Sequence, residues 1–571
     1  MAQSYWGPAW RAEKIEALKA DETEFDLIVI GGGITGAGIY REACARGLTV
    51  LLVEQKDFAW GTSSRSSKMV HGGLRYLGKG QFGLAKDSVT ERQNLMSQLK
   101  GLVDPLPFLM GHYKGGFPGP WIFDKLLAIY DFFAGKKYRG FVKEHVRDYW
   151  APGMTQANLL GVTRFMDAVT DDARLVMRVL DDGNRQGGVA INYLKATELL
   201  RGAGDFGKIT GVRLLDDVSQ EVFSVRASAV VNATGAWTDE LRQKLGHKKH
   251  IRPLRGSHLV VPFWRLPVSF SVSFFHPRDK RPVFVFPWEG QTVIGTTDLD
   301  HQSGLGKEAN ISSEELAYLL EAANHQFSKT GLVVADVIAS WAGVRPVVVD
   351  GYDDSESVAQ AKPSDEKREH MIWDDQGCVS IAGGKLTTFR LLAMEVLQAA
   401  QPYLSSKLSS EDLNQPTDFE QVLAAQSLYP RINLSVSLQQ RLIGRYGPNA
   451  QELISSANEG DLKSLGNSDT LLQELIWACL NESVTHLDDL LLRRVRLGML
   501  QPEGARLIIE PHAERLRAEL GWSPERWQEE WQRYLEIVQD FYSVPTDNEQ
   551  GGVEKDGDAK GESESRENGH D

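Results

Sequence analysis

The chain has 571 residues, of which 42% are hydrophobic and 25% charged, and its formal net charge is −14 at pH 7. This length allows two or more hydrophobic cores, whereas the acidic balance argues against nucleic acid as a partner. No apolar run approaches the roughly 20 residues of a membrane-spanning helix, and Cys44, Cys378 and Cys479 have the spacing of neither a metal site nor a disulfide framework, which favours a reducing compartment and no bound metal.

The first segment, residues 1–24, is a polar leader with mixed charges, and it lacks the apolar stretch that a secretory signal needs. Within it, residues 10–20 predict one helix. The main fold is expected to begin near Phe25.

Residues 26–38 predict an apolar strand, a glycine loop and the start of a helix. Gly31, Gly33 and Gly36 fit G-x-G-x-x-G: the first permits the tight turn, the second lets the backbone approach a pyrophosphate, and the third lets the helix pack close to the strand. Glu54 ends the next apolar run and is placed to accept hydrogen bonds from ribose hydroxyls. These features predict a dinucleotide site with phosphates at the helix N-terminus, but they do not distinguish NAD from FAD.

Residues 61–76 form a loop rich in hydroxyls, cations and glycine, with apolar residues interleaved as in a partly buried segment. Such a loop can wrap a pyrophosphate and reach a flavin ring and an anionic substrate. Residues 229–237 and 381–388 are two more apolar strands that end in small-residue turns, and the second leads into a helix whose N-terminus can cap a flavin carbonyl oxygen. The candidate cofactor-binding residues in these three segments are Thr62, Ser63, Ser64, Ser67, His71, Gly235, Gly384, Leu386 and Thr387.

Between these segments lie residues 258–262, 282–287 and 292–296, which have the composition of strands and predict an antiparallel substrate sheet. Residues 350–370 are polar and rich in Ser, Asp and Lys, which predicts a loop.

After Tyr403 the pattern changes to amphipathic helices, for example over residues 471–480 and 487–500. Residues 547–571 are acidic and contain no large apolar residue after Val553, so a disordered tail is expected there.

Several of these motifs, in this chain order, resemble those of the FAD-dependent (aerobic, respiratory) glycerol-3-phosphate dehydrogenases. The motifs that carry the resemblance are residues 31–38, residues 63–76, Gly256-Ser-His258, Gly343-Val-Arg-Pro346 and Gly383-Gly-Lys-Leu-Thr-Thr388. Residues 171–175, 295–298 and 490–494 with Gly498 are similar to further landmarks of the family. The resemblance implies FAD as cofactor, sn-glycerol 3-phosphate as substrate, dihydroxyacetone phosphate as product and membrane quinone as electron acceptor.

The expected fold class is therefore α/β, with a Rossmann-like FAD-binding domain, an antiparallel-sheet substrate domain and a C-terminal helical domain. The FAD-binding and substrate domains are expected to interleave over residues 25–402, and the helical domain to occupy residues 403–546.

Oxidation of a phosphorylated secondary alcohol by a flavin requires cations for the phosphate and a base for the hydroxyl proton. The resemblance implies that Arg75, Arg345 and Lys385 surround the phosphate and the alcohol, with Tyr76 also at the substrate. Arg368 is a further substrate candidate, although the residues before it depart from the family pattern.

His258 opens an apolar strand and is the preferred general base, because imidazole titrates near neutral pH. Arg345 is the alternative for that role, or it stabilises the alkoxide electrostatically.

Residues 121–133, with Lys136, Lys137 and Arg139 after them, have two interpretations. They form either a helix that lies in a membrane interface or a core helix under the substrate sheet. The first predicts an enzyme bound peripherally to the cytoplasmic face of the membrane, while the oligomeric state stays open, a homodimer included.

Three functions are consistent with the sequence. The first is a dehydrogenase that passes electrons to quinone. The second is a glycerol-phosphate oxidase that passes them to oxygen, and the third is a flavin-binding protein without catalytic activity.

Overall fold

The computed structural model describes residues 6–20, 24–202, 207–349, 370–405, 408–420 and 434–545. The expected loop over residues 350–370, apart from His370, and the expected tail over 547–571 lie outside these described ranges.

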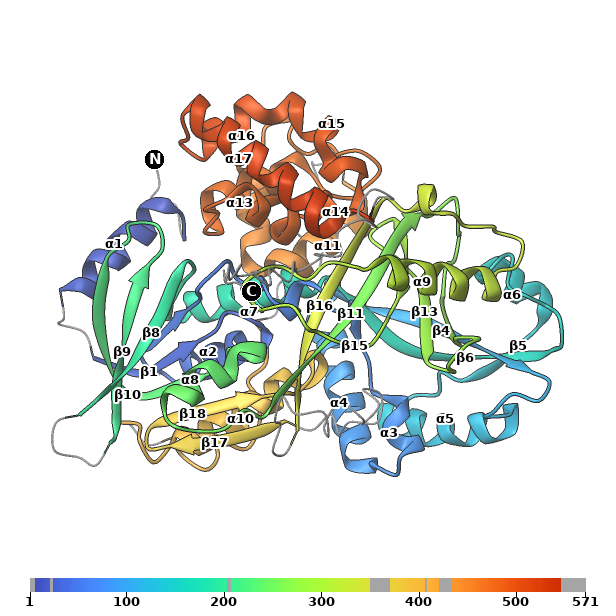
Figure 1. The fold of residues 1–571 in the computed structure, drawn as a ribbon, viewed down its shortest axis with the longest axis horizontal. Helices are drawn as coiled ribbons and strands as arrows, with labels where there is room; N and C mark the ends of the chain where they lie inside the picture. Colours follow the sequence, from blue (N-terminus) through green and yellow to red (C-terminus); the bar gives the residue numbers. More distant parts are fainter. Residues whose placement is uncertain are drawn as a thin grey trace, which may run out of the picture.

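Sheet A is the sheet on which the glycine loop is mounted (Figure 1). Along its path it contains β17 (Met371–Asp375), β18 (Cys378–Ala382), β10 (Val222–Asn232), β1 (Glu24–Ile30), β2 (Val50–Val53) and β7 (Val189–Ile191), and the hairpin of β8 (Leu194–Arg201) and β9 (Ile209–Asp216) adds to β10. The five strands from β18 to β7 are parallel, and β17 pairs antiparallel at the edge. The three apolar stretches expected to build one dinucleotide fold therefore lie side by side as β1, β10 and β18.

The apolar strands of sheet A are buried on both faces, as in other parallel sheets. Alternate residues of β1 point to opposite faces: Leu27 and Val29 pack with three helices, and Ile28 and Ile30 pack with two others. The first face is covered by α2 (Ile34–Cys44), α7 (Asp172–Arg185) and α10 (Phe389–Ala400), and the second by α1 (Pro8–Lys19) and α8 (Thr238–Lys244). The expected leader helix is thus present as α1.

Sheet B is largely antiparallel. Along its path it contains β15 (Leu299–Asp300), β11 (Ile251–Pro262), β14 (Gln291–Gly295), β13 (Pro282–Trp288), β12 (Ser271–Phe275), β4 (Val103–Tyr113), β6 (Leu159–Thr170) and β3 (Met69–Val70), while β16 (Ala339–Val348) pairs with β11 and β5 (Gly140–Val142) with β6. The three strands predicted for a substrate sheet lie in β11, β13 and β14, which pair antiparallel as expected.

Helices cover both faces of sheet B. Val260 of β11 packs with the C-terminal helices, whereas Leu259 and Val261 pack with α9 (Ser313–Gln326). The remaining helices of this half are α3 (Leu74–Gly78), α4 (Phe82–Gln98), α5 (Pro120–Ala134) and α6 (Glu144–Trp150).

The C-terminal part is helical, as predicted (Figure 1). Its longer elements are α11 (Val436–Tyr446), α12 (Ala450–Ser455), α13 (Leu472–Asn481), the π-helical turn η8 (Asp489–Arg494), α14 (Leu497–Leu500), α15 (Arg506–Ile509), α16 (Ala513–Glu519) and α17 (Pro524–Ile537). The helix predicted over residues 471–480 is present as α13. The continuous helix predicted over residues 487–500 is wrong, because Arg496 has a left-handed backbone with φ of 65° and separates η8 from α14.

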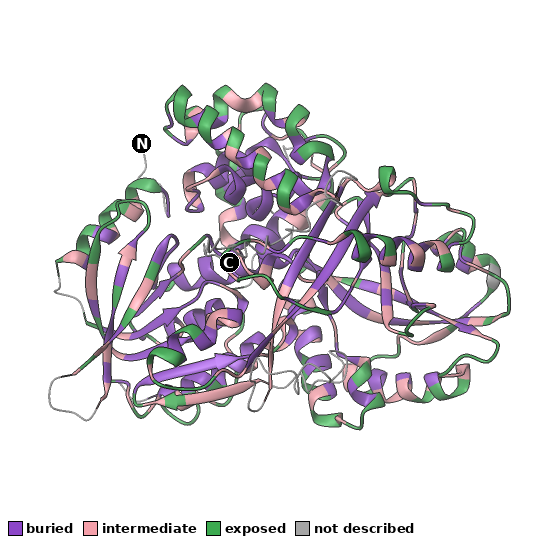
Figure 2. Cartoon of the chain, viewed as in Figure 1, coloured by how far each residue is buried: buried purple, intermediate pink, exposed green. Residues whose placement is uncertain are grey.

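The predicted fold class is confirmed: an α/β molecule with a parallel dinucleotide sheet, an antiparallel second sheet and a helical C-terminal part. Burial follows this layout, since the strands of both sheets are mostly buried and the exposed residues gather on the outer sides of the helices (Figure 2). None of the helices in the described ranges has the length and apolar composition needed to cross a bilayer. The domain boundaries drawn from the sequence remain predictions.

Candidate active site

The glycine loop between β1 and α2 leaves no room for side chains. A Cβ on Gly31, whose φ is 114°, would lie 2.6 Å from the carbonyl oxygen of Ala233, and a Cβ on Gly36 would lie 1.9 Å from the carbonyl oxygen of Gly31. The strand, the loop and the helix can therefore pack this closely only because these positions are glycine. Helix α2 begins at Ile34 after Gly33, and no side chain of its N-cap residue covers its N-terminus.

Glu54 follows β2 and reaches back to the same loop. Its carboxylate accepts hydrogen bonds from the backbone N–H of Gly32 at 2.7 Å and of Lys56 at 2.9 Å. Burial raises the pKa of this carboxyl, against the lowering effect of the two backbone donors. The acid expected at the end of the second strand thus borders the glycine loop.

The segment over residues 61–76 runs from sheet A to sheet B, which it joins through β3. Two of its hydroxyls and one of its backbone N–H groups bind three different parts of the fold. Ser63 Oγ accepts from the N–H of Ile34 at 2.9 Å, Thr62 donates to the carbonyl of Val344, and the N–H of His71 donates to Thr387 Oγ1 at 3.1 Å. The segment therefore connects the start of α2, strand β16 and the turn before α10.

One cavity of about 410 Å³ lies where these elements meet. The predicted site residues that line it are Gly31, Gly33, Glu54, Thr62, Ser63, Ser67, His71, Tyr76, Gly235, His258, Arg345, Gly384, Lys385, Leu386 and Thr387. These residues come from both sheets, so candidates for the cofactor and for the substrate share one cavity.

His258 is held by contacts along its strand. It lies opposite Trp341 of β16 and Gly295 of β14, and its ring stacks on the Trp341 indole at 4.9 Å and 14°. A Cβ on Gly295 would lie 2.1 Å from His258 Cδ2, so glycine is needed beside the ring. His258 Nε2 forms a hydrogen bond of 2.8 Å with Ser67 Oγ.

The environment of His258 favours its neutral form. Burial, together with the positive charges of Lys68 and Arg345, lowers the pKa of the imidazole well below its ordinary value. Its Nδ1 atom is buried and has no hydrogen-bond partner among the described residues. At neutral pH the side chain is therefore an uncharged imidazole with one ring nitrogen not engaged by the described protein groups.

Two of the predicted cations, Arg345 and Lys385, line the same cavity. Arg345, half-buried on β16, donates to Asp298 Oδ1 at 2.7 Å and to the carbonyl of Thr297 at 3.2 Å. Lys385 lies on the turn after β18, with Nζ 3.6 Å from the centre of the Tyr76 ring. These two of the four predicted cations thus line the same cavity as His258.

Four predicted residues do not line the cavity. Arg75 is exposed on α3, although its neighbour Tyr76 is buried and lines the cavity. Ser64 is buried in the loop, and its hydroxyl donates weakly to the carbonyl of Gly61 at 3.5 Å. Gly36 instead packs α2 against the loop, and Arg368 lies outside the described residues.

Sequence reasoning gave no role to several residues of the cavity region, of which Asp298 and Trp341 bear most directly on the predicted site. Asp298 lines the cavity and pairs with Arg345, and the motif over residues 295–298 does not by itself indicate a role for this carboxylate. Trp341 stacks on the His258 ring, but the position of Trp341 in an apolar strand does not indicate that its indole contacts a histidine.

The described residues fit FAD. The glycine loop, the N-terminus of α2 and Glu54 meet the needs of a dinucleotide, and the turns at Gly235 and Gly384, with φ of 61° and 86°, border the same cavity. His258, Arg345 and Lys385 line the same cavity, so an anionic alcohol can be bound there beside a flavin.

Comparison with known proteins gives matches over most of the chain. A family model described as "FAD dependent oxidoreductase" matches residues 26–388, and one described as "C-terminal domain of alpha-glycerophosphate oxidase" matches residues 412–527. The aerobic glycerol-3-phosphate dehydrogenase of Staphylococcus saprophyticus is 32% identical over 507 residues, covering 84% of this chain and 88% of the relative. Glycerol-3-phosphate dehydrogenase 2 of Mycobacterium tuberculosis is 33% identical over 554 residues, covering 93% and 91%.

Solved structures agree. The glycerol-3-phosphate dehydrogenase of Bacillus halodurans, complexed with FAD, superposes with a TM-score of 0.69 at 28% identity, covering 93% of this chain and 99% of that one. The L-alpha-glycerophosphate oxidase of Mycoplasma pneumoniae superposes with a TM-score of 0.52 at 15% identity, covering 68% and 98%, which shows similarity of fold alone.

Proposed function

Because the chain belongs to the family of the FAD-dependent aerobic glycerol-3-phosphate dehydrogenases, we propose that it oxidises sn-glycerol 3-phosphate to dihydroxyacetone phosphate and passes the electrons to membrane quinone. The single observation that carries this proposal is the shared cavity, in which a neutral buried histidine lies with two cations next to the dinucleotide loop. FAD, when bound, supplies the acceptor for the hydride that leaves the alcohol carbon.

Arg345 and Lys385 are the residues that bind the phosphate and the reacting end of the substrate. A phosphate monoester carries about −1.5 to −2 charges near neutral pH, so two cations in a partly enclosed cavity attract it strongly. Asp298 orients the Arg345 guanidinium, since the two groups are 2.7 Å apart. Arg368 and Arg75 remain predictions for this role.

His258 takes the hydroxyl proton. Its lowered pKa keeps the imidazole unprotonated at neutral pH, which a base requires, and Ser67 at 2.8 Å fixes the ring orientation. Arg345 is less suited to that role, because a guanidinium paired with a carboxylate keeps its proton. Arg345 instead stabilises the negative charge that develops on the substrate oxygen.

The proposed function is tested with purified enzyme under nitrogen. Adding glycerol 3-phosphate is expected to bleach the flavin absorbance near 450 nm, and a soluble quinone analogue to restore it with turnover. Glycerol without phosphate is the matched control and is expected to leave the colour unchanged. A flavin that glycerol 3-phosphate does not bleach contradicts the substrate assignment.

A second experiment, carried out in air, distinguishes quinone from oxygen as the electron acceptor. The family model that matches residues 412–527 takes its description from an oxidase, so oxygen is the competing acceptor. We expect little peroxide per glycerol 3-phosphate consumed when the quinone analogue is present. Stoichiometric peroxide with no stimulation by the analogue identifies an oxidase instead.

Helix α5 supports a peripheral membrane contact, which a quinone-linked enzyme needs. Phe123 and Leu127 are buried in the core, but Trp121 is 72% exposed and Phe132 80% exposed. Trp121 and Phe132 are about three helical turns apart and therefore lie along one stripe of the helix. The interpretation as a core helix thus applies to one face of α5, and the interpretation as a membrane-interface helix applies to the other. The exposed face, with Lys136 beside it, suits the cytoplasmic surface of a membrane.

Replacing Trp121 and Phe132 together with serine is expected to reduce binding to anionic lipid vesicles at least about tenfold, because each large apolar group contributes roughly 1.5–3 kcal/mol when buried. Detergent-free flotation measures the bound fraction. Leu507→Ser is the control, since Leu507 is 77% exposed on α15 in the C-terminal part. Equal flotation of the double variant and the wild type contradicts the membrane contact.

Assembly of this protein into a homodimer remains a prediction.

A further inference from the structure

Three arginines of the C-terminal part are buried against the FAD-binding half of the molecule. Arg493 and Arg494 end the π-helical turn η8, and Arg496 follows with its left-handed backbone. Each of the three side chains is at most 1% exposed. The three guanidinium groups bind two loops of the FAD-binding half, at Asp57 and at Ser64.

The first loop contact is at Asp57, which is fully buried. Arg494 binds its carboxylate through two parallel hydrogen bonds of 2.7 and 2.8 Å, and Arg493 Nε adds a third of 2.5 Å. A bidentate guanidinium–carboxylate pair fixes direction as well as distance. The charges of the two arginines lower the pKa of Asp57, although burial alone raises it.

Asp57 belongs to the loop that borders the nucleotide part of the cavity. Glu54 in this loop accepts from the N–H of Gly32, the N–H of Ala59 donates to the carbonyl of Gly32 at 3.0 Å, and the ring of Phe58 lies 2.8 Å from where a Cβ of Gly32 would be. The loop over residues 54–59 thus supports the glycine loop directly, and the two arginines hold it from the side of the C-terminal part.

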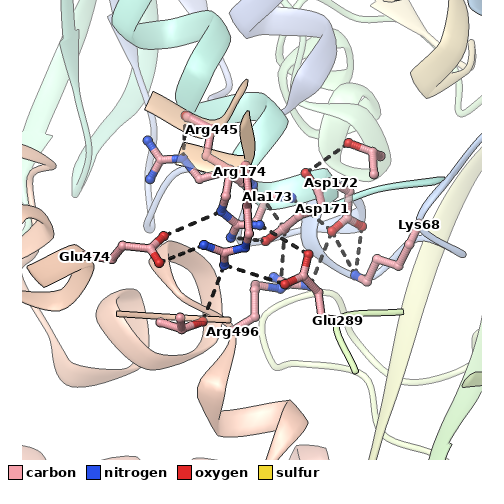
Figure 3. Close-up of polar contacts among 12 residues, drawn as sticks. Lys68, Asp171, Asp172, Ala173, Arg174, Glu289, Arg445, Glu474 and Arg496 are labelled. Atoms are coloured by element: carbon pink, nitrogen blue, oxygen red, sulfur yellow. Dashed lines mark hydrogen bonds and ion pairs between the residues drawn. The ribbon is translucent and has the colours of Figure 1, made fainter. Parts of the chain in front are cut away.

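The second contact is at Ser64. Its carbonyl accepts from Arg496 at 2.6 Å and from Lys68 at 2.5 Å. Figure 3 shows Arg496 and Lys68 together with Asp171 and Asp172, and both cations reach the Asp172 carboxylate, Lys68 at 2.8 Å and Arg496 at 3.3 Å.

Of the two cations at Ser64, Arg496 is the one that stays protonated at neutral pH. Burial and the charge of Arg496 lower the pKa of the Lys68 ammonium to about 7, against the raising effect of Asp172. Ser64 follows Ser63, whose hydroxyl accepts from the first N–H of α2. The C-terminal part therefore contacts both loops that flank the N-terminus of α2.

We propose that Arg493, Arg494 and Arg496 form a clamp, called here the arginine clamp, through which the C-terminal helices hold the two FAD-binding loops closed and retain the cofactor. The three arginines are positioning residues that act through Asp57 and Ser64. The proposal rests on FAD dependence and not on the identity of the substrate or electron acceptor. By linkage, the C-terminal helices and FAD stabilise each other's binding to these loops.

Asp57→Asn in the FAD-loaded enzyme tests the clamp. The amide keeps the shape of the side chain, but it replaces one acceptor oxygen with a donor that faces the guanidinium groups. We expect FAD release to accelerate at least about tenfold, as loss of a charged buried hydrogen bond implies. The rise of flavin fluorescence after dilution of the holoenzyme measures this rate without any substrate.

The matched control is Glu482→Gln. Glu482 of the C-terminal part also forms a buried bidentate pair, with Arg174 of α7 at 2.6 and 2.7 Å, and that pair does not include residues of the two loops. The backbone carbonyl of Glu482 accepts from Arg494 Nε at 2.9 Å, and the glutamine variant keeps this backbone contact. Both variants are expected to lower the thermal midpoint, but Glu482→Gln is expected to release FAD within about twofold of the wild-type rate. Equal acceleration in the two variants overturns the proposal, because it shows general loosening of the interface.

Arg494→Lys keeps the charge and loses the two-pronged contact, so it tests the clamp even if Asp57→Asn does not fold. It is expected to accelerate FAD release by about threefold or more. An unchanged release rate in whichever of the two variants is recovered overturns the proposal. If glycerol 3-phosphate fails to bleach the wild-type flavin while the release rates follow this pattern, the substrate assignment fails and the clamp stands.

Discussion

Replacing His258 with glutamine is expected to lower kcat for glycerol 3-phosphate oxidation by about 10²–10⁴-fold, the usual contribution of a positioned general base. The glutamine amide can keep a polar contact with Ser67, which is 2.8 Å from the imidazole in the wild type, but it cannot accept a proton. Stopped-flow bleaching of the flavin under nitrogen measures the affected step directly. FAD content is expected to stay near that of the wild type, because the variant alters no residue of the glycine loop.

His301→Gln is the matched control for this variant. His301 is also a buried histidine whose pKa burial lowers, but it does not line the cavity. Its bleaching rate is expected to stay within about threefold of wild type. If His258→Gln keeps more than about a tenth of the wild-type rate, His258 is not the base, and Arg345 becomes the remaining candidate.

Gly36→Ala is expected to yield protein without bound flavin. The added Cβ would lie 1.9 Å from the carbonyl oxygen of Gly31, and both groups belong to backbone that cannot move without separating α2 from β1. Overpacking of this kind costs about 1–3 kcal/mol or more, and here the displaced parts are those that approach the pyrophosphate. The ratio of absorbance near 450 nm to that at 280 nm is expected to fall by at least about tenfold.

Gly83→Ala serves as the control, because here the change from glycine to alanine is expected to stabilise the protein instead of destabilising it. Gly83 lies in α4, and a Cβ there has no atom within 4 Å. Because alanine is favoured over glycine in helices by about 1 kcal/mol, this variant is expected to stay yellow and to unfold at an equal or higher temperature. A yellow Gly36→Ala enzyme with wild-type activity contradicts the role assigned to the glycine loop.

The local parts of the fold were the predictable ones. The strand, glycine loop and helix at β1 and α2 could be predicted because the glycines that allow their close packing are neighbours in the sequence. The antiparallel strands β11, β13 and β14 could be predicted from their residue composition. The break at Arg496 could not be predicted from hydrophobic periodicity, because that pattern reports only apolar residues. The residues around the break are arginines that bind carboxylates from distant parts of the chain.

The candidate site shows the same limit. Motifs adjacent to turns, such as those at Gly384 and Glu54, predicted residues that line the cavity. Arg75 and Tyr76 were predicted together, but on the short helix α3 adjacent residues point in different directions, and Tyr76 lines the cavity while Arg75 is exposed. Trp341 and Asp298 depend on strand register between β11 and β16 and on the loop after β14, which no single sequence segment contains.

The wide separation of Asp57 from its arginines has a consequence for biosynthesis. Arg493 follows Asp57 by 436 residues, so the carboxylate leaves the ribosome long before its counterions are made. A nascent chain can form the β1–α2–β2 unit early, but Asp57 stays in contact with water until nearly all of the polypeptide has emerged and the arginines can bind it. With the proposed arginine clamp, firm retention of the flavin has to wait for completion of translation, and we expect chains that end before the arginines to bind the flavin more weakly.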